Sequence, residues 1–294
     1  MAIIFAYIFV VLIWTTTPLA IVWSGETDWF FGVAARTLLG ALIILPLLWW
    51  KKAKQPAFRL DFEALKVYAM AALPIFGGMT LMYWSAQYLP SGWISIVFAM
   101  TPVMTGIIAH YLLPDKRLTP RKILAIGLSL FGLWLIFAPN LESKLAGLQL
   151  IAILAALMAV ILHSLGSVLV KRCGTNLPAL HVAIGALWVT VIGHLIIDPT
   201  ALLTWPELQA RESAAILYAA TVGSVIGFLL YFYLIRHVDA MKVALIPVIT
   251  PVFAILIGHY LNNEKLSLSL WFGTGIVILG LVLFEWRFKN RKVI

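Results

Sequence analysis

Long apolar stretches recur along the chain and are separated by short polar connections. Each stretch runs for about 18–25 residues, the length that an α-helix needs to cross about 30 Å of hydrocarbon. The longest connections, 51–64 and 198–211, are too short to form a soluble domain. The pattern predicts an all-α membrane protein with ten transmembrane helices, at roughly 2–22, 30–50, 65–87, 91–112, 121–138, 148–170, 178–197, 212–235, 240–261 and 267–288.

The basic residues predict the orientation of these helices, because cytoplasmic loops hold an excess of Lys and Arg. With the N-terminus inside, 17 of the 21 basic residues fall in cytoplasmic loops, three in external loops, and Arg36 within a helix. Both termini are therefore predicted to be cytoplasmic. The net charge of +9 then reflects topology and contact with anionic lipid, and it does not indicate nucleic-acid binding.

Composition agrees with a membrane protein and excludes a soluble one. The chain is 63% hydrophobic and 11% charged, with a mean hydropathy of +1.01, whereas soluble domains carry about 25% charged residues. Cys173 is the only cysteine, which excludes an intramolecular disulfide and a cysteine-based metal site. Residues 2–22 lack a basic leader and run directly into the multispan pattern, so they are interpreted as the first span.

One segment occurs twice, and the two copies are separated by about half the chain. Residues 99–116 and 248–265 are identical at eight of 18 aligned positions, at a constant offset of 149. Thr101-Pro102 therefore aligns with Thr250-Pro251. A repeat with this spacing indicates that the fold is built from two related halves.

The number of helices between the two copies gives their relative direction. Five predicted helices separate them, and an odd number makes the copies cross the membrane in opposite directions. The same offset aligns Trp14 with His163 and Gly78 with Gly227. Residues 1–140 and 148–290 are therefore predicted to be two five-helix inverted repeats, related by a pseudo-two-fold axis in the membrane plane. Secondary transporters share this architecture, in which exchanging the conformations of the halves alternates access.

These features resemble the EamA-like ten-helix carriers of the bacterial drug/metabolite transporter superfamily. The resemblance rests on LIWTT at 12–16, on Arg36 early in helix 2, and on the Thr-Pro helix and the acidic-Lys turn (Asp115, Glu264) of each repeat. Two positions depart from the family pattern, since Asp115 stands where Glu is usual and His163 where helix 6 often has Trp. The resemblance implies a multi-pass inner (plasma) membrane carrier, often an exporter of amino acids or related metabolites, with a cavity lined by helices 1, 3, 4, 6, 8 and 9.

Prolines in the middle of predicted helices are candidate hinges. Pro102 and Pro251 each remove a backbone hydrogen bond within a span, and the freed carbonyl needs a partner such as the hydroxyl of a neighbouring threonine. Pro18 adds a kink near the middle of helix 1. The prolines are either hinges beside the substrate or static kinks, and the recurrence of Thr-Pro in both repeats favours hinges.

Aromatic and hydroxyl side chains within the spans are candidates for the substrate cavity, because polar groups in membrane helices usually face the bundle interior. Such a lining suits a substrate with an apolar body and one polar end. The threonines of helix 1 either offer hydroxyls to substrate or bond their own helix backbone four residues back. The predicted cavity residues are Trp14, Thr15, Tyr83, Trp84, Thr101, His163, Ser167, Tyr231 and Thr250.

His163 and Arg36 place ionisable groups inside predicted spans. His163 either serves the cavity through hydrogen bonding or proton carriage, or is a neutral histidine satisfied by a serine or a carbonyl. Arg36 lies about 10 Å inside helix 2, at about 1.5 Å per residue. It either meets a substrate carboxylate or has a structural role, snorkelling outward or bonding carbonyl groups.

The sequence predicts a secondary transporter that moves a small metabolite, an amino acid or a related compound, by alternating access in the export direction. A non-transporting membrane receptor or assembly subunit with the same fold is the alternative, although no loop is large enough to bind a partner as a soluble domain. An enzyme is disfavoured because HExxH and GxSxG motifs are absent. No Asp or Glu lies at mid-membrane, so a carboxylate relay for protons or sodium is also disfavoured.

The expected partners are a small-molecule substrate and membrane lipid, with no nucleic acid, cofactor or metal. Both a monomer and a homodimer fit the sequence. The Gly223–Gly227 GxxxG motif joins either two helices of one chain or two chains.

Overall fold

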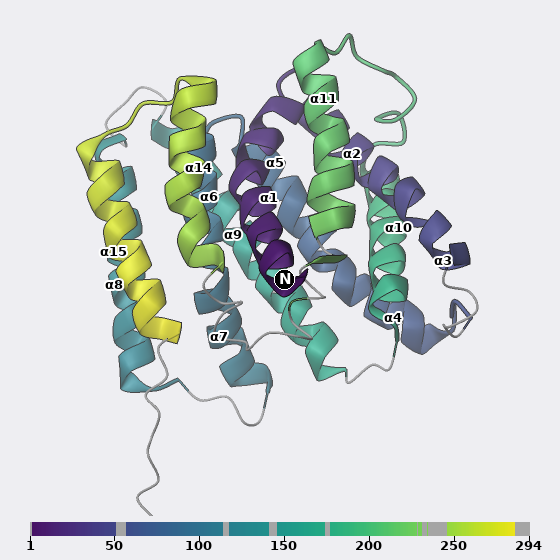
Figure 1. Ribbon diagram of the computed structural model, residues 1–294, viewed down its shortest axis with the longest axis horizontal. Coiled ribbons are helices and arrows are strands. Elements are labelled where there is room, and N and C mark those ends of the chain that lie inside the picture. The colour runs from purple at the N-terminus through teal and green to yellow at the C-terminus, as the bar shows by residue number, and fades with distance from the viewer. Residues whose placement is uncertain are drawn as a thin grey trace, which may run out of the picture.

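The computed structural model describes residues 2–50, 57–113, 118–140, 146–173, 177–227, 229–230, 234 and 246–285, and every regular element in these ranges is helical (Figure 1). The helices of the first half are α1 (Ala2–Ser24), α2 (Trp29–Ile44), α3 (Pro46–Trp50), α4 (Phe62–Leu73), η1 (Pro74–Met79), α5 (Thr80–Ser85), α6 (Ser91–Phe98), α7 (Thr101–Leu112), α8 (Pro120–Phe137) and η2 (Ala138–Asn140). Those of the second half are α9 (Ala146–Arg172), α10 (Ala179–Ile197), α11 (Ala210–Tyr218), η3 (Ala219–Ile226), α14 (Ile246–Asn262) and α15 (Leu268–Glu285).

The lengths and hydropathies of these helices confirm an all-α membrane protein. Eight helical stretches among the described residues are long and apolar enough to cross a membrane, and the apolar helix Val248–Asn262 is shorter. The predicted span 212–235 is described as far as 227, where it forms α11 and η3, and beyond that at only three positions. The count of ten spans and the cytoplasmic placement of both termini stay predictions.

Two predicted spans are interrupted where proline removes a backbone donor. The span 30–50 divides at Leu45, after which Pro46 begins α3, and the span 91–112 divides at Ala99 and Met100. Pro102 occupies the first turn of α7, where backbone N–H groups have no acceptor within their own helix. Pro18 and Pro251 instead lie inside the continuous helices α1 and α14, so the two Thr-Pro copies have different local structures.

Two π-helical segments lie within the third and eighth predicted spans. η1 separates α4 from α5, and η3 follows α11 without a break. Under the 149-residue offset Gly78 in η1 corresponds to Gly227, the residue directly after η3. A π-turn is rare, widens the helix and is frequently found at functional sites. The segments therefore mark corresponding places in the two halves.

The helix contacts occur in corresponding pairs. α1 packs on α14 and on α11 and η3, while α9 packs on α7 and on α4, η1 and α5. The contact of α10 with α4 has its counterpart in the contact of α2 with η3, and the remaining large interfaces join α2 with α10, α6 with α14, and α8 with α15. Figure 1 shows α8 and α15 together at one edge of the bundle and α4 and α10 at the other. Exchanging the two halves would leave this set of contacts nearly unchanged.

The α8–α15 interface depends on glycines that let two backbones approach. A Cβ added at Gly132 would lie 2.8 Å from the carbonyl oxygen of Gly273, and one at Gly280 would overlap Ser129. Gly127, on the same helix, has nothing within 4 Å of its would-be Cβ. Close approach of this kind is the main source of helix association in lipid, where no hydrophobic force draws helices together.

We expect Gly132→Ala to destabilise the protein by about 1–3 kcal/mol, since the methyl group must push α15 away from α8. Gly127→Ala is the matched control, and its better helix propensity predicts an unchanged or slightly higher stability. Thermal unfolding in detergent measures both. Equal melting temperatures for the two variants would contradict this account of the interface.

Candidate functional site

Arg36 is buried inside the bundle and contacts both halves of the chain. The Asp28 side chain caps the start of α2 by accepting from the backbone N–H groups of Phe30 and Phe31, at 2.8 and 3.0 Å, and so fixes the helix that carries Arg36. The Arg36 side chain is 6% exposed, and its Nε donates to the hydroxyl of Ser224 at 3.2 Å. It therefore does not snorkel to the surface, and its acceptor is a hydroxyl rather than a carbonyl.

The two π-segments meet at this arginine. Ser224 belongs to η3, and Met79, whose sulfur lies 3.8 Å from Arg36 Nη1, ends η1. The guanidinium carbon lies 5.9 Å from the centre of the Tyr83 ring, one turn beyond η1. A cation–π contact, a hydroxyl and a thioether leave the positive charge without a negative partner, and Arg36 forms no ion pair with any described residue.

Gly223 faces the remaining side of the guanidinium, where a single methyl group would make van der Waals contact. A Cβ added at Gly223 would lie 3.7 Å from Arg36 Nη2 and 3.9 Å from Thr17 Oγ1. A Cβ at Gly227 would lie 3.3 Å from Ile13. Both glycines of the GxxxG motif thus pack against helices α1 and α2 of the same chain, as the single-chain interpretation of the motif predicts.

Tyr83 lies between Arg36 and a cleft of about 340 Å³. The cleft is lined by Ile21, Val22, Gly25, Glu26, Tyr83, Ala86 and Gln87, from the ends of α1 and α5. The Tyr83 hydroxyl accepts a hydrogen bond from Ser24 at 2.8 Å, which holds the ring against α1. Trp84 is directed elsewhere and packs on Tyr88 with ring centres 5.3 Å apart. Of these two predicted cavity residues, Tyr83 reaches both the cleft and the arginine.

A second cluster surrounds the interruption between α6 and α7. The hydroxyl of Thr101 donates to the carbonyl of Phe98, which is the group that Pro102 leaves without its helical donor. Ser164 on α9 donates to the carbonyl of Thr101 at 3.3 Å. The His163 ring meets Phe98 edge-on at 5.0 Å, and its Nδ1 is buried with no hydrogen-bond partner among the described residues. The structure thus brings His163, Thr101 and Pro102 together.

Corresponding residues of the two halves repeat one packing arrangement. A Cβ at Gly78 would lie 3.7 Å from the Cβ of His163, and one at Gly227 would lie 3.9 Å from Nε1 of Trp14. The 149-residue offset pairs Gly78 with Gly227 and His163 with Trp14. Each glycine of the first pair therefore packs beside one residue of the second pair. This correspondence was visible in the sequence only as an alignment of single residues.

The helix 1 threonines divide between the two interpretations. Thr16 and Thr17 donate to backbone carbonyls of Leu12 and Ile13, four residues back, at 2.9 and 2.6 Å. Thr15 is 2% exposed, and its hydroxyl has no partner among the described residues. Thr15 therefore follows neither interpretation in full, because its hydroxyl does not bond its own helix backbone.

The remaining predicted cavity residues have varied positions. Trp14 is half-buried beside Ala6 and Val10. Thr250 is buried on α14, whereas Ser167 is exposed and donates to the carbonyl of His163 at 2.9 Å. Tyr231 lies outside the described residues.

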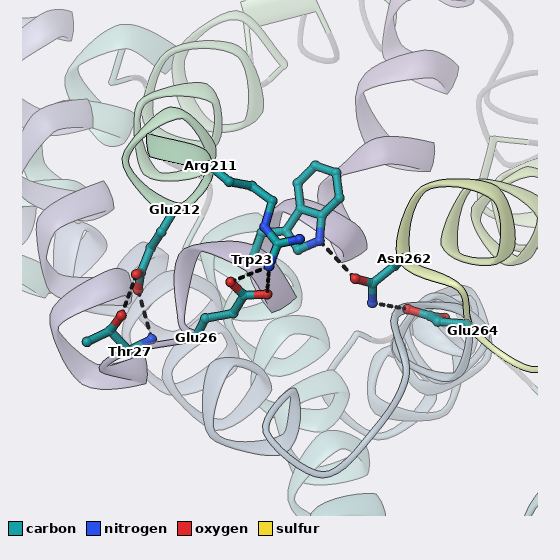
Figure 2. A network of polar contacts seen from close by, with 7 residues as sticks. All are labelled: Trp23, Glu26, Thr27, Arg211, Glu212, Asn262 and Glu264. Carbon is teal, nitrogen blue, oxygen red and sulfur yellow. Dashed lines mark hydrogen bonds and ion pairs between the residues drawn. The ribbon is translucent and has the colours of Figure 1, made fainter. Parts of the chain in front are cut away.

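A polar network joins four segments at one end of the bundle, called here the Glu26 end and formed by residues 23–28, 86–92, 209–212 and 262–264. Figure 2 shows Arg211 paired with Glu26, at 2.6 Å, while its guanidinium covers the Trp23 ring at 5.4 Å. Beside this pair, the carboxylate of Glu212 accepts from the backbone N–H and the hydroxyl of Thr27, at 3.0 and 2.6 Å. These contacts hold the α1–α2 connection against the start of α11.

The network continues to α14 and α6. Trp23 Nε1 donates to Asn262 Oδ1 at 3.0 Å, and Asn262 donates in turn to Glu264 at 3.1 Å (Figure 2). The Glu264 carboxylate accepts from the backbone N–H groups of Ser91 and Gly92, at 2.9 and 3.1 Å. Glu264 thus caps the N-terminus of α6 from another segment, where the helix dipole favours a negative charge.

Some of these residues were not singled out in the sequence. Glu212 is fully buried although it stands at a span end. Its partner Thr27 lies 185 residues away in the sequence, so the pairing is evident only from the fold. His194 is 1% exposed on α10, with Nε2 2.9 Å from the hydroxyl of Thr80. Glu264 had a signal, since it forms the acidic-Lys turn that follows the Thr-Pro helix, but that turn does not indicate which helix it caps.

Comparison with known proteins places the chain in a family. The sequence profile of the EamA-like transporter family matches residues 1–138 and, separately, residues 150–286. The chain therefore belongs to the EamA-like transporter family, and it is a member of the drug/metabolite transporter superfamily.

Proteins of similar sequence are also named as transporters. The uncharacterized inner membrane transporter YedA of Escherichia coli (strain K12) is 27% identical, over 96% of this chain and 91% of YedA. The uncharacterized transporter YoaV of Bacillus subtilis (strain 168) is 23% identical, over 88% and 87%. A solved crystal structure shares the fold with a TM-score of 0.67 at 17% identity, over 96% of this chain and 97% of that one. The chain is thus a transporter and a multi-pass inner membrane protein.

We expect Glu264→Ala to destabilise the protein by about 1–3 kcal/mol, because two backbone N–H groups at the start of α6 lose their acceptor. Glu207→Ala removes an exposed carboxylate near the same end and should change the stability by less than about 0.5 kcal/mol. Thermal unfolding in detergent compares the two. A Glu264→Ala protein as stable as the Glu207→Ala control would show that the cap has no energetic role.

Proposed function

We propose that the protein is an alternating-access carrier that moves a small metabolite with an apolar body and one polar end, an amino acid or a related compound, out of the cytoplasm. The observation that carries this proposal is the Arg36 cluster, where the π-segments of the two halves meet at a buried polar centre. Carriers with inverted repeats bind substrate at the interface of the repeats, on helices whose regular hydrogen bonding is interrupted.

The relation between the halves supports the same proposal. The family profile matches residues 1–138 and 150–286 separately, and the helix contacts occur in corresponding pairs. The two halves pack alike but differ in local conformation at Pro102 and Pro251. Each half would therefore be able to adopt the conformation of the other. The exchange would convert one open state into the other.

The surroundings of Arg36 suit the proposed substrate. The guanidinium is surrounded by the ring of Tyr83 and the hydroxyl of Ser224. The hydroxyl of Thr17 lies on the far side of the gap beside Gly223. Aromatic faces cover an apolar body, while hydroxyls and a cation take a polar end.

The polar contacts at the Glu26 end are those expected of a carrier that is closed at this end. The distribution of Lys and Arg predicts that this end is external, and its network joins α1, α6, α11 and α14. Release of substrate to the outside would require at least part of the network to separate. We therefore assign the network the role of the external closure.

Transport and the proline hinges are tested by flux into and out of proteoliposomes loaded with labelled amino acids and related metabolites. We expect flux for some of the panel, and a rate about 30-fold lower for Pro102→Ala combined with Pro251→Ala. Two restored backbone hydrogen bonds, each worth about 1 kcal/mol, would stabilise one conformation by that factor. Pro120→Ala, at the exposed start of α8, is the control. Absence of flux for every compound would contradict the carrier, and unchanged flux in the double variant would contradict only the hinges.

The role of the Glu26 end is tested by cross-linking. In a Cys173→Ser background, which removes the only thiol, Glu26→Cys and Arg211→Cys would be joined by a reducible bifunctional thiol reagent. We expect flux to fall by about tenfold or more on cross-linking and to return on reduction, because gating motions set transport rates. The single-cysteine variants, treated alike, control for modification. Full flux through the cross-linked protein would rule out this closure.

A further inference from the structure

The Arg36 guanidinium is a cation that lacks a compensating charge. It is 6% exposed, and no described carboxylate pairs with it. A buried cation without an anion is costly, and in membrane spans such residues are usually paired or functional. The described contacts of Arg36, to Ser224, Met79 and Tyr83, are those of an incomplete site rather than of a structural ion pair.

One edge of the guanidinium remains available. Nε and Nη1 are directed at Ser224 and Met79, whereas no hydrogen bond joins Nη2 to a described residue. Gly223 leaves room beside Nη2 for one methyl-sized group, and Thr17 Oγ1 borders the same gap. An anion placed there would receive N–H donors from the guanidinium and lie close to a hydroxyl.

The Tyr83 ring separates the guanidinium from the cleft at the Glu26 end. Arg36 lies about 10 Å along α2 from its start, taking about 1.5 Å per residue. Tyr83 contacts the guanidinium with its face and also lines the 340 Å³ cleft. Movement of this one ring would therefore connect the cleft with the guanidinium.

We propose that Arg36, with Ser224 and the space beside Gly223, binds the carboxylate of the transported metabolite. The inference rests on the proposed function and narrows its substrate to a compound with a carboxylate at one end and an apolar body. Guanidinium and carboxylate match in a planar, two-pronged geometry that an ammonium or a hydroxyl cannot reproduce. A site with a buried donor rejects an analogue that lacks the acceptor, because the donor is then left unpaired.

Matched pairs of compounds test the carboxylate without altering the protein. L-leucine, L-phenylalanine and L-threonine would each be compared with the amino alcohol in which CH₂OH replaces the carboxylate and the ammonium remains. Binding is measured as the rise in melting temperature in detergent, and transport as flux in proteoliposomes. For at least one pair, we expect the wild-type protein to prefer the acid by about tenfold or more, the ratio that one charge-assisted hydrogen bond supplies.

Variants assign the preference to the arginine. Arg36→Gln should abolish the difference between acid and alcohol, and Arg36→Lys should retain only part of it. Arg172→Gln, which removes an exposed arginine at the end of α9, is the control and should behave as wild type. If Arg36→Gln does not fold, the wild-type pairs and Ser224→Ala decide, since Ser224→Ala should reduce the preference for the acid. A sodium chloride series separates a carboxylate site from a site for any small anion.

The outcomes distinguish the two proposals. Flux of acids and alcohols at equal rates would overturn the carboxylate site and leave the carrier in place. An acid-specific rise in melting temperature that Arg36→Gln removes, without flux of any compound, would uphold the site and overturn the carrier. A preference that survives Arg36→Gln, a shift reproduced by chloride alone, or no acid-dependent shift at all would overturn the site.

Discussion

Hydrocarbon cannot solvate a backbone amide, a hydroxyl or a charge, and this constraint explains most of the structure. It requires helices wherever the chain crosses the membrane, and it requires a partner wherever a helix is interrupted. Thr101 supplies one to the carbonyl of Phe98 at the break before Pro102. Thr16 and Thr17 bond the helix 1 backbone for the same reason, next to Pro18. Because these carbonyl groups receive hydrogen bonds, the buried polar groups that lack a partner are informative.

Among those groups, three share one structural feature. They are the hydroxyl of Thr15, Nδ1 of His163 and, by the lack of a counter-charge, the guanidinium of Arg36. Each lies on a helix that contacts a π-segment, α1 and α2 against η3 and α9 against η1. A protein that moves a polar molecule through the membrane must keep such groups available, because the substrate completes their hydrogen bonds in transit.

The sequence predicted what depends on composition along one helix. Hydropathy predicted the eight long apolar helices, and the threonine beside Pro102 was expected to satisfy a freed carbonyl, as Thr101 does. What depends on neighbouring helices was not predictable. The widened turns of η1 and η3 contain Gly78 and Gly223, which face neighbouring helices, and the buried Arg36 bonds Ser224, 188 residues away. Likewise, nothing along the chain indicates that Glu264 caps α6.

A short chain of contacts links the two polar centres of the molecule. The Tyr83 ring lies against Arg36, and its hydroxyl bonds Ser24, which directly precedes the turn that carries Glu26 and Thr27. An anion at Arg36 would change what the Tyr83 ring contacts, and through Ser24 it would affect the α1–α2 connection, which bonds Arg211 and Glu212. Coupling between two sites requires an element whose arrangement both of them influence. Tyr83 is the candidate for such an element, because no other described side chain lines the cleft and also contacts Arg36.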